Sequence, residues 1–264
     1  MKIVVIGCGV MGGALAKHFA QGNEVLLYDH HKEKSEKLAK EIGAKVCKSL
    51  AEEAKEAEVI LLAVKPKDLP SAAKAISAVT KGVLISILAG TSLATLKKNF
   101  PSASCVRMMP NLPLTCGSGV LGLAEDPALR ESVKKDVGTL LQGLGLVLWL
   151  PEAKIEALTP LAGSGPAFVL VMIEAMIEAG IFMGFTAAEA QELVLKTMEG
   201  TIALLRASGK HPAELKWEIA SPAGTTIAGM KEMEERGVRA GIAGAMLAAY
   251  GRNQVLLGEN PSIF

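Results

Sequence analysis

Aromatic residues are scarce in this sequence: they make up 4% of its 264 residues, although half of all residues are hydrophobic. The core must therefore be built from Ala, Val, Leu, Ile and Met side chains, and 27 glycines let neighbouring backbones approach closely. Such a composition favours helices in tight mutual contact. The length allows a first domain of about 150 residues and a second, smaller one.

An excess of charge of either sign is also missing. The sequence has 28 basic and 27 acidic residues, a formal net charge of +1, and no run of Lys and Arg that stands apart from acidic residues. Nucleic acids and anionic membranes attract proteins through concentrated positive charge. We therefore expect neither as a partner. The charged run at residues 30–37 mixes both signs at helical spacing, which is typical of a solvated helix face.

Cysteines are few, and they lie far apart: Cys8, Cys47, Cys105 and Cys116 form no CxxC pair. Neither a zinc site nor a disulfide framework is indicated, and a reducing, cytoplasmic compartment fits best. The apolar run near the start has only four residues before glycines intervene, whereas a secretory signal needs about 7–15.

The sequence also has no apolar run long enough to span a membrane. The most apolar stretch, Ala167–Ile177, contains Glu174 and is shorter than the roughly 20 residues that a membrane-spanning helix requires. We expect no membrane association.

Short strands alternate with helical or glycine-rich segments through the first part of the sequence. This pattern predicts an α/β fold with a doubly wound, Rossmann-type sheet over residues 1–152. After about residue 150 the strand signals stop, so residues 153–264 are predicted to form an all-helical domain. The predicted strands are Lys2–Ile6, Glu24–Tyr28, Ala44–Val46, Val59–Val64, Val83–Leu88, Ser104–Arg107, Gly119–Leu123 and Leu146–Leu150. The predicted helices of the second domain are Phe168–Met183, Thr186–Ala207, Gly224–Arg236 and Ala240–Leu257.

A GxGxxG motif follows the first predicted strand directly. Gly7 permits a tight turn, Gly9 lets the backbone approach a pyrophosphate, and Gly12 lets the helix pack against the strand. Val10 and Met11 would offer helix N–H groups to the phosphates. Asp29 ends the second strand at close to the spacing of an acid that binds ribose. A dinucleotide site is the favoured reading, and the alternative is a glycine-rich turn without a ligand.

The choice between NADPH and NADH stays open. Asp29 could accept hydrogen bonds from the ribose of NADH and would repel a 2′-phosphate, but His30, His31 and Lys32 follow it and could neutralise that phosphate. The segment Ala63-Val64-Lys65-Pro66 ends another strand at the edge where such sheets bind ligands. It could border a nicotinamide, or the proline could simply end the strand.

Three further segments are hard to explain by packing alone: Met109-Pro110-Asn111, Gly163-Ser164-Gly165-Pro166 and Ser221-Pro222-Ala223-Gly224-Thr225-Thr226. The last precedes a predicted helix whose first turn has unpaired N–H groups, with two threonine hydroxyls beside them. This arrangement would suit a carboxylate. Ordinary capping of a helix by a polar turn is the alternative.

Together with the glycine motif and residues 63–66, in this order and spacing, these segments resemble the pyrroline-5-carboxylate reductase family over almost the whole sequence. The resemblance implies hydride transfer from NADPH or NADH to the C=N bond of 1-pyrroline-5-carboxylate, giving L-proline, at a site between the two domains. It implies catalytic roles for Thr226, Lys65 and Asn111; substrate binding by Ser221, Gly224, Thr225, Thr226, Ser164 and Gly165; and cofactor binding by Gly7, Gly9, Val10, Met11, Gly12, Asp29, His30, Ala63, Val64, Lys65 and Pro66. It also implies a homo-oligomer in which the second domain serves dimerisation.

Three residues depart from the family pattern, which commonly has Thr, Tyr and Gly where this sequence has Leu112, Phe168 and Ala223. These departures bear on substrate affinity more than on reaction type. Two alternatives remain. A β-hydroxyacid dehydrogenase would need a lysine on the first long helix of the second domain, and none occurs between Ile155 and Leu195. A non-catalytic protein that senses NAD(P) would be expected to lack the carboxylate-binding segment.

Overall fold

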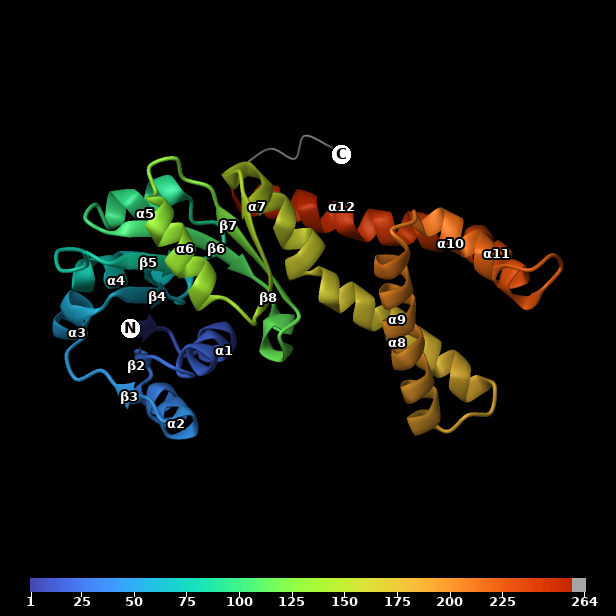
Figure 1. The fold of residues 1–264 in the computed structure, drawn as a ribbon, viewed down its shortest axis with the longest axis horizontal. Helices are drawn as coiled ribbons and strands as arrows, with labels where there is room; N and C mark the ends of the chain where they lie inside the picture. Colours follow the sequence, from blue (N-terminus) through green and yellow to red (C-terminus); the bar gives the residue numbers. More distant parts are fainter. Residues whose placement is uncertain (258–264) are drawn as a thin grey trace. The chain divides into compact units, whose positions relative to one another are not determined.

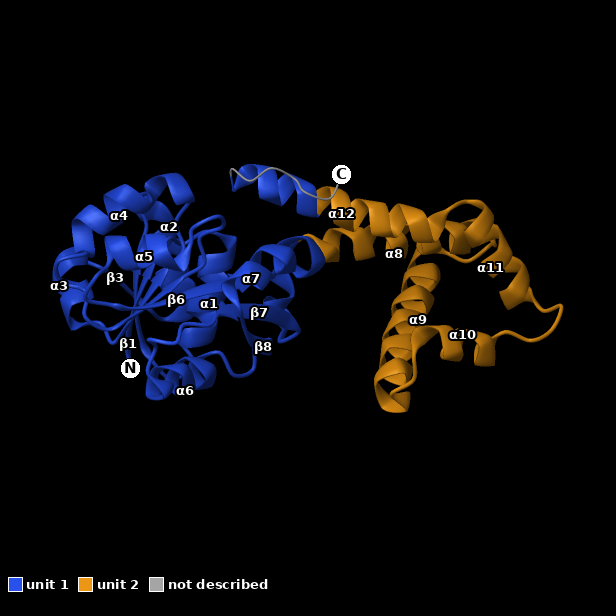
Figure 2. Ribbon diagram, turned by 90° about the horizontal axis from the view of Figure 1, so that it is seen from above, with its two compact units in different colours: residues 1–163, 250–264 blue, residues 164–249 orange. Residues whose placement is uncertain are grey.

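The structure, a computed structural model, describes residues 1–257. The chain divides into two compact units (Figure 2): unit 1 contains residues 1–163 and the described residues from 250 on, and unit 2 contains residues 164–249. The sequence-based division at 152/153 differs, because residues 153–163 and the end of the last helix group with unit 1. Residues 258–264 of the predicted second domain lie outside the described residues.

Unit 1 is built around a sheet of eight strands in the order β3-β2-β1-β4-β5-β6-β7-β8 (Figure 1). All neighbouring strands are parallel except β6 and β7, which are antiparallel. The strands are β1 (Lys2–Ile6), β2 (Glu24–Tyr28), β3 (Lys45–Val46), β4 (Val59–Leu62), β5 (Val83–Ser86), β6 (Ser104–Pro110), β7 (Gly119–Ala124) and β8 (Gly145–Leu150). The predicted Rossmann-type fold is therefore confirmed.

Helices cover both faces of this sheet, and the side chains of β1 show why its sequence is continuously apolar. Ile3 and Val5 lie in one buried cluster, whereas Val4 and Ile6 lie in the other. Alternate residues of a strand point to opposite faces, so a strand covered on both faces needs apolar residues throughout. The first cluster includes residues of α1 (Val10–Phe19), α2 (Lys32–Ile42) and α6 (Glu131–Leu140); the second includes residues of α3 (Leu50–Glu56), α4 (Leu69–Ile76) and α5 (Leu93–Asn99).

The order of the strands fixes where a ligand can bind. The chain winds outward from β1 through β2 to β3, and then resumes on the other side of β1 with β4. Ligands of such sheets bind at the carboxyl ends of the strands where the winding reverses. Here those ends carry the glycine motif after β1 and residues 63–66 after β4.

Unit 2 is entirely helical, with no strand between residues 164 and 249. Helices α8 and α9 pack as a hairpin in which a Cβ added to Gly180 would lie only 2.9 Å from the Ala190 Cβ. Thr186 and Glu189 form a capping box at the start of α9. The helices are α8 (Gly165–Phe182), α9 (Ala187–Ser208), α10 (Pro212–Ile219), α11 (Thr225–Glu235) and α12 (Val238–Leu256), the last of which ends in unit 1.

Helix α7 (Glu152–Leu158) and a π-helical turn, η3 (Thr159–Gly163), precede α8. The helical run Glu152–Phe182 is long and apolar enough to cross a membrane by length and composition. The apolar stretch Ala167–Ile177 identified from the sequence is therefore only part of a longer apolar helical run. Most of it is exposed within one chain: Leu170 is 62% exposed and Val171 63%. A helix that is apolar on all sides is normally covered, by protein or by lipid.

Candidate functional site

The glycine motif forms the turn between β1 and α1, and two of its glycines cannot carry a side chain. Gly7 has a φ of +106°, and a Cβ there would overlap the Ala63 carbonyl group. A Cβ on Gly12 would overlap the Gly7 carbonyl oxygen. Gly9, by contrast, has open space at this position, so it leaves the backbone accessible. The three glycines thus do what the spacing predicts: a tight turn, an open approach and close helix packing.

Asp29 lies directly after β2, and both of its carboxylate oxygens are hydrogen-bonded to backbone. Oδ2 accepts from the Cys8 N–H and Oδ1 from the His31 N–H, each at 2.8 Å. The side chain therefore joins the glycine turn to the loop between β2 and α2. Burial, and to a smaller extent the Asp29 charge, raise the pKa of the neighbouring Cys8 thiol to about 12. That thiol is protonated at neutral pH.

A cavity of about 360 Å³ opens beside these residues. It brings together seven of the eleven predicted cofactor residues: Gly7, Gly9, Asp29, His30, Ala63, Val64 and Lys65. Val10, Met11, Gly12 and Pro66 are not in its lining; Val10 is exposed at the start of α1, Gly12 is buried, and Pro66 begins the short helix η1 (Pro66–Asp68). Lys34, Lys67 and Ser71 also line it and were not predicted from the sequence.

This site fits a dinucleotide. The first turn of α1 presents N–H groups that have no partner within the helix, and its N-cap, Gly9, has no side chain to occupy them. A pyrophosphate needs such donors together with an open backbone approach. The carboxylate of Asp29 and the basic side chains of the cavity are groups that could make polar contacts with an adenosine ribose.

Asn111 is buried directly after β6, and its side-chain amide already makes hydrogen bonds. The side-chain oxygen accepts from the Val120 N–H at 2.7 Å, and the side-chain nitrogen donates to the Ala162 carbonyl at 2.9 Å. Asn111 therefore links β7 to the π-helical turn η3. Met109 also approaches this turn, because a Cβ on Gly163 would lie 3.3 Å from its terminal methyl carbon.

Ser164 and Gly165 lie where α8 begins. Ser164 is the N-cap residue but makes no side-chain capping bond, whereas its carbonyl accepts from the Ala167 N–H at 3.0 Å. Gly165 is buried, and Pro166 occupies the first turn, where the missing N–H costs nothing.

The segment Ser221–Thr226 forms a tight turn at the start of α11 in unit 2. The Gly224 N–H donates to the Ser221 carbonyl at 3.1 Å, and a Cβ on Gly224 would overlap the Ser221 hydroxyl. Ala223 has a φ of +57°, and no other residue in the described chain except glycine has a positive φ. Gly224 supplies no side-chain cap, so the first-turn N–H groups of α11 remain available beside the Thr225 and Thr226 hydroxyls.

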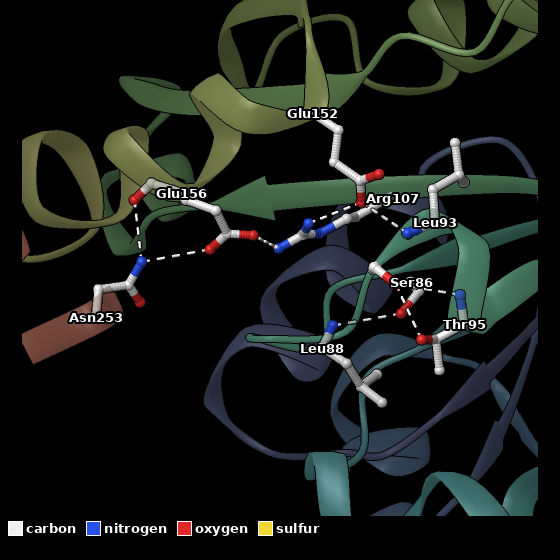
Figure 3. A network of polar contacts seen from close by, with 9 residues as sticks. Ser86, Leu88, Leu93, Thr95, Arg107, Glu152, Glu156 and Asn253 are labelled. Carbon is white, nitrogen blue, oxygen red and sulfur yellow. Dashed lines mark hydrogen bonds and ion pairs between the residues drawn. The ribbon is translucent and has the colours of Figure 1, made fainter. Parts of the chain in front are cut away.

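A network around Arg107 was not found from the sequence (Figure 3). The side chain of Arg107 is 6% exposed and pairs with Glu152, at 2.8 Å, and with Glu156. Glu152 also accepts from the Leu93 N–H at 2.6 Å, and Asn253 donates to the Glu156 backbone and side chain. The network holds α7 and the end of α12 against the sheet. An arginine between Val106 and Met108 of β6 is the one signal that could have indicated it.

Two family models match the chain. Residues 152–256 match the model described as pyrroline-5-carboxylate reductase dimerisation. Residues 2–90 match the model described as NADP oxidoreductase, coenzyme F420-dependent.

Several relatives match over most of the chain. A pyrroline-5-carboxylate reductase from Synechocystis is 36% identical over 262 residues, covering 97% of this chain and 98% of the relative. Pyrroline-5-carboxylate reductase 3 from Danio rerio is 40% identical over 220 residues, covering 82% of this chain and 76% of the relative.

Solved structures agree. The 1-pyrroline-5-carboxylate reductase from Streptococcus pyogenes has a TM-score of 0.87 at 28% identity, covering 97% of this chain and 98% of its own. The Plasmodium falciparum pyrroline carboxylate reductase, solved with NADP bound, has a TM-score of 0.86 at 27% identity, covering 98% of each chain. The resemblance predicted from the five motifs is confirmed, and the chain belongs to the pyrroline-5-carboxylate reductase family.

Proposed function

We propose that this protein is an NAD(P)H-dependent oxidoreductase that converts 1-pyrroline-5-carboxylate to L-proline, the last step of proline biosynthesis. The observation that carries the proposal is the coexistence, in one chain of this family, of a glycine turn that fits a dinucleotide and a turn at residues 221–226 whose uncapped helix N–H groups suit a carboxylate. A chain that only sensed the dinucleotide would have no use for the second turn.

The cofactor site lies in unit 1. The α1 N-terminus at Gly9, Val10 and Met11 would hold the pyrophosphate, and residues 63–66 would border the nicotinamide. A reduced nicotinamide, when bound, would supply the hydride for the imine carbon, and the C=N π electrons would become the lone pair of the ring nitrogen. A protonated imine accepts hydride readily, so the protein acts chiefly by positioning and electrostatics.

The substrate carboxylate would bind the turn at the start of α11, where Ser221, Gly224 and Thr225 would hold it. First-turn N–H groups and the positive end of a helix dipole favour an anion there. The Thr226 hydroxyl would hydrogen-bond the ring nitrogen that becomes the amine. Ser164 and Gly165 would contribute from the start of α8.

Lys65 and Asn111 differ in what supports their predicted catalytic roles. Lys65 is exposed at the rim of the dinucleotide cavity, where its cation can meet an anionic ligand. Asn111 is buried and two of its amide atoms already bind backbone groups. A positioning role therefore suits Asn111 better: it holds the π-helical turn from which α8 begins.

A homo-oligomer follows from the exposed apolar surface of unit 2. Residues 152–256 match a dimerisation family, and much of α8 is apolar and exposed in one chain. A second copy would cover this surface. Such an assembly suits a soluble enzyme, and we propose the cytoplasm as its compartment.

Turnover of Thr226→Ala tests the proposal. We expect the wild-type protein to oxidise a reduced nicotinamide cofactor only when 1-pyrroline-5-carboxylate is present. The variant should lose at least about tenfold in kcat/KM, equivalent to about 1.4 kcal/mol of transition-state stabilisation. The control is Thr201→Ala, whose hydroxyl donates to the Thr197 carbonyl within α9. Cofactor binding without turnover by the wild type would instead favour the sensing alternative.

A further inference from the structure

The hydrogen bonds of Asp29 bear on the choice between NADH and NADPH, which its position in the sequence leaves open. Its two oxygens accept hydrogen bonds from opposite segments: Cys8 in the glycine turn and His31 at the start of α2. Rotating the side chain out of the cavity would break both bonds and leave a charged acceptor unpaired. The carboxylate is therefore a fixed feature of the cavity wall.

The basic side chains of the cavity are not fixed in the same way. His30, His31, Lys34, Lys65 and Lys67 line it, and all five residues are exposed. Within residues 1–257 the Lys34 ammonium takes part in no ion pair. Long exposed side chains are screened by solvent and lose conformational entropy on pairing, so they add little to the affinity for an anion.

NADPH differs from NADH by a phosphate on the adenosine ribose, which carries about two negative charges. Next to Asp29 this phosphate is repelled by a carboxylate that its two hydrogen bonds hold in place. The attraction between the phosphate and the solvated lysine and histidine side chains is too weak to offset this repulsion. A ribose 2′-hydroxyl, in contrast, can donate a hydrogen bond to a remaining lone pair of either carboxylate oxygen.

We propose that this protein binds NADH in preference to NADPH and that Asp29 determines the preference. The inference rests on the proposed function, and it specifies which of the two cofactors the dinucleotide site takes.

Equilibrium binding tests the preference without any need for turnover. NADH and NADPH are titrated against the full chain, with nicotinamide fluorescence as the readout. We expect the Kd for NADH to be at least about tenfold lower than that for NADPH, a factor that corresponds to about 1.4 kcal/mol. As a second measurement on the wild type, AMP should displace NADH more effectively than adenosine 2′,5′-bisphosphate does.

The variant Asp29→Asn removes the charge and retains the shape and one acceptor oxygen. Its ratio of NADPH to NADH affinity should rise at least about tenfold, mainly because NADPH binds more tightly. Asp29→Ser, which also lacks the charge, should shift the ratio in the same direction. The matched control is Asp136→Asn, an exposed position on α6, which should leave both affinities unchanged.

The outcomes separate the two proposals. Equal or tighter binding of NADPH to the wild type overturns the preference but leaves the reductase assignment standing. An unchanged affinity ratio in both folded Asp29 variants removes Asp29 as the determinant. Failure of the wild type to bind either dinucleotide overturns the reductase assignment together with the preference.

Discussion

Ala223 occupies a backbone conformation that suits glycine. Its φ of +57° lies in the left-handed region, which costs a residue with a Cβ about 1–2 kcal/mol. Family members commonly have glycine at this position. The structure shows why: the turn requires a positive φ, which glycine adopts without strain. The strain lies in the turn that we propose binds the substrate carboxylate.

Replacing Ala223 with glycine should therefore stabilise the protein. The relief of strain exceeds the extra entropy of glycine in the unfolded chain, which gives a net gain of about 0.5 kcal/mol in the free energy of unfolding. Urea denaturation measures it. Ala228→Gly, inside helix α11, is the control and should destabilise by about 1 kcal/mol. A loss of stability in Ala223→Gly would contradict the argument.

The four cysteines should differ sharply in reactivity. Burial raises the pKa of the Cys8 thiol to about 12 and those of Cys47 and Cys105 to about 11, so their thiolate forms are rare at neutral pH. Cys116 is exposed. Alkylation near neutral pH, followed by mass spectrometry, should modify Cys116 first. Raising the pH toward the thiol pKa should accelerate modification of Cys8, and rapid labelling of Cys8 at neutral pH would contradict its burial.

At the residue scale, the sequence predicted what local spacing determines. Gly7 and Gly12 are required by the turn that their spacing indicates, and Asp29 lies at the end of β2 as expected. The hydrogen bond between Asn111 and Ala162 could not be predicted from the sequence, because the two residues are 51 positions apart. A motif identifies such a residue, but only the tertiary structure says which atoms it binds.

Among the elements, α7 depends on the network around Arg107. Arg107→Met would leave two carboxylates without their cation in a partly buried site, so we expect a loss of about 3 kcal/mol in the free energy of unfolding. Arg236→Met is the matched control: the pair Arg236–Glu232 is exposed at the end of α11 and should contribute less than about 1 kcal/mol. Chemical denaturation measures both losses. Equal losses in the free energy of unfolding would show that the burial of Arg107 does not increase the contribution of its ion pairs to stability.

The predicted elements follow the observed ones closely where the apolar pattern is strong, as in β1, β2, α8 and α9. The pattern did not indicate α7 or α10, which have seven and eight residues. It also gave no direction for β7, which runs antiparallel to β6. The connection between them, containing only the short helix η2 (Leu112–Cys116), is too short for a crossover between parallel strands, which needs about a dozen residues. The length of this connection could therefore have predicted that β7 runs antiparallel to β6.

For the molecule as a whole, the exposed apolar surface of α8 predicts association. Val171→Glu introduces a charge on this surface and should shift the protein toward smaller species in sedimentation velocity experiments. Lys135→Glu, an exposed substitution on α6, is the control and should leave the sedimentation unchanged. An unaltered assembly in Val171→Glu would place the contact between copies elsewhere.

The sequence indicated a Rossmann-type region followed by helices, but it did not indicate that the chain returns to the first unit. That return depends on contacts such as the one between Asn253 and Glu156, which are 97 positions apart. Periodicity identifies α12 as a helix and says nothing about which unit its end joins.

This return makes unit 2 an insertion within unit 1. During synthesis, the sheet and the pair between Arg107 and Glu156 can form early, but the site on α7 that Asn253 fills must wait until all of unit 2 has been synthesised. The helices of unit 2 emerge in that interval, with their apolar sides uncovered. Nascent chains of this protein should therefore need chaperone protection while unit 2 is being synthesised.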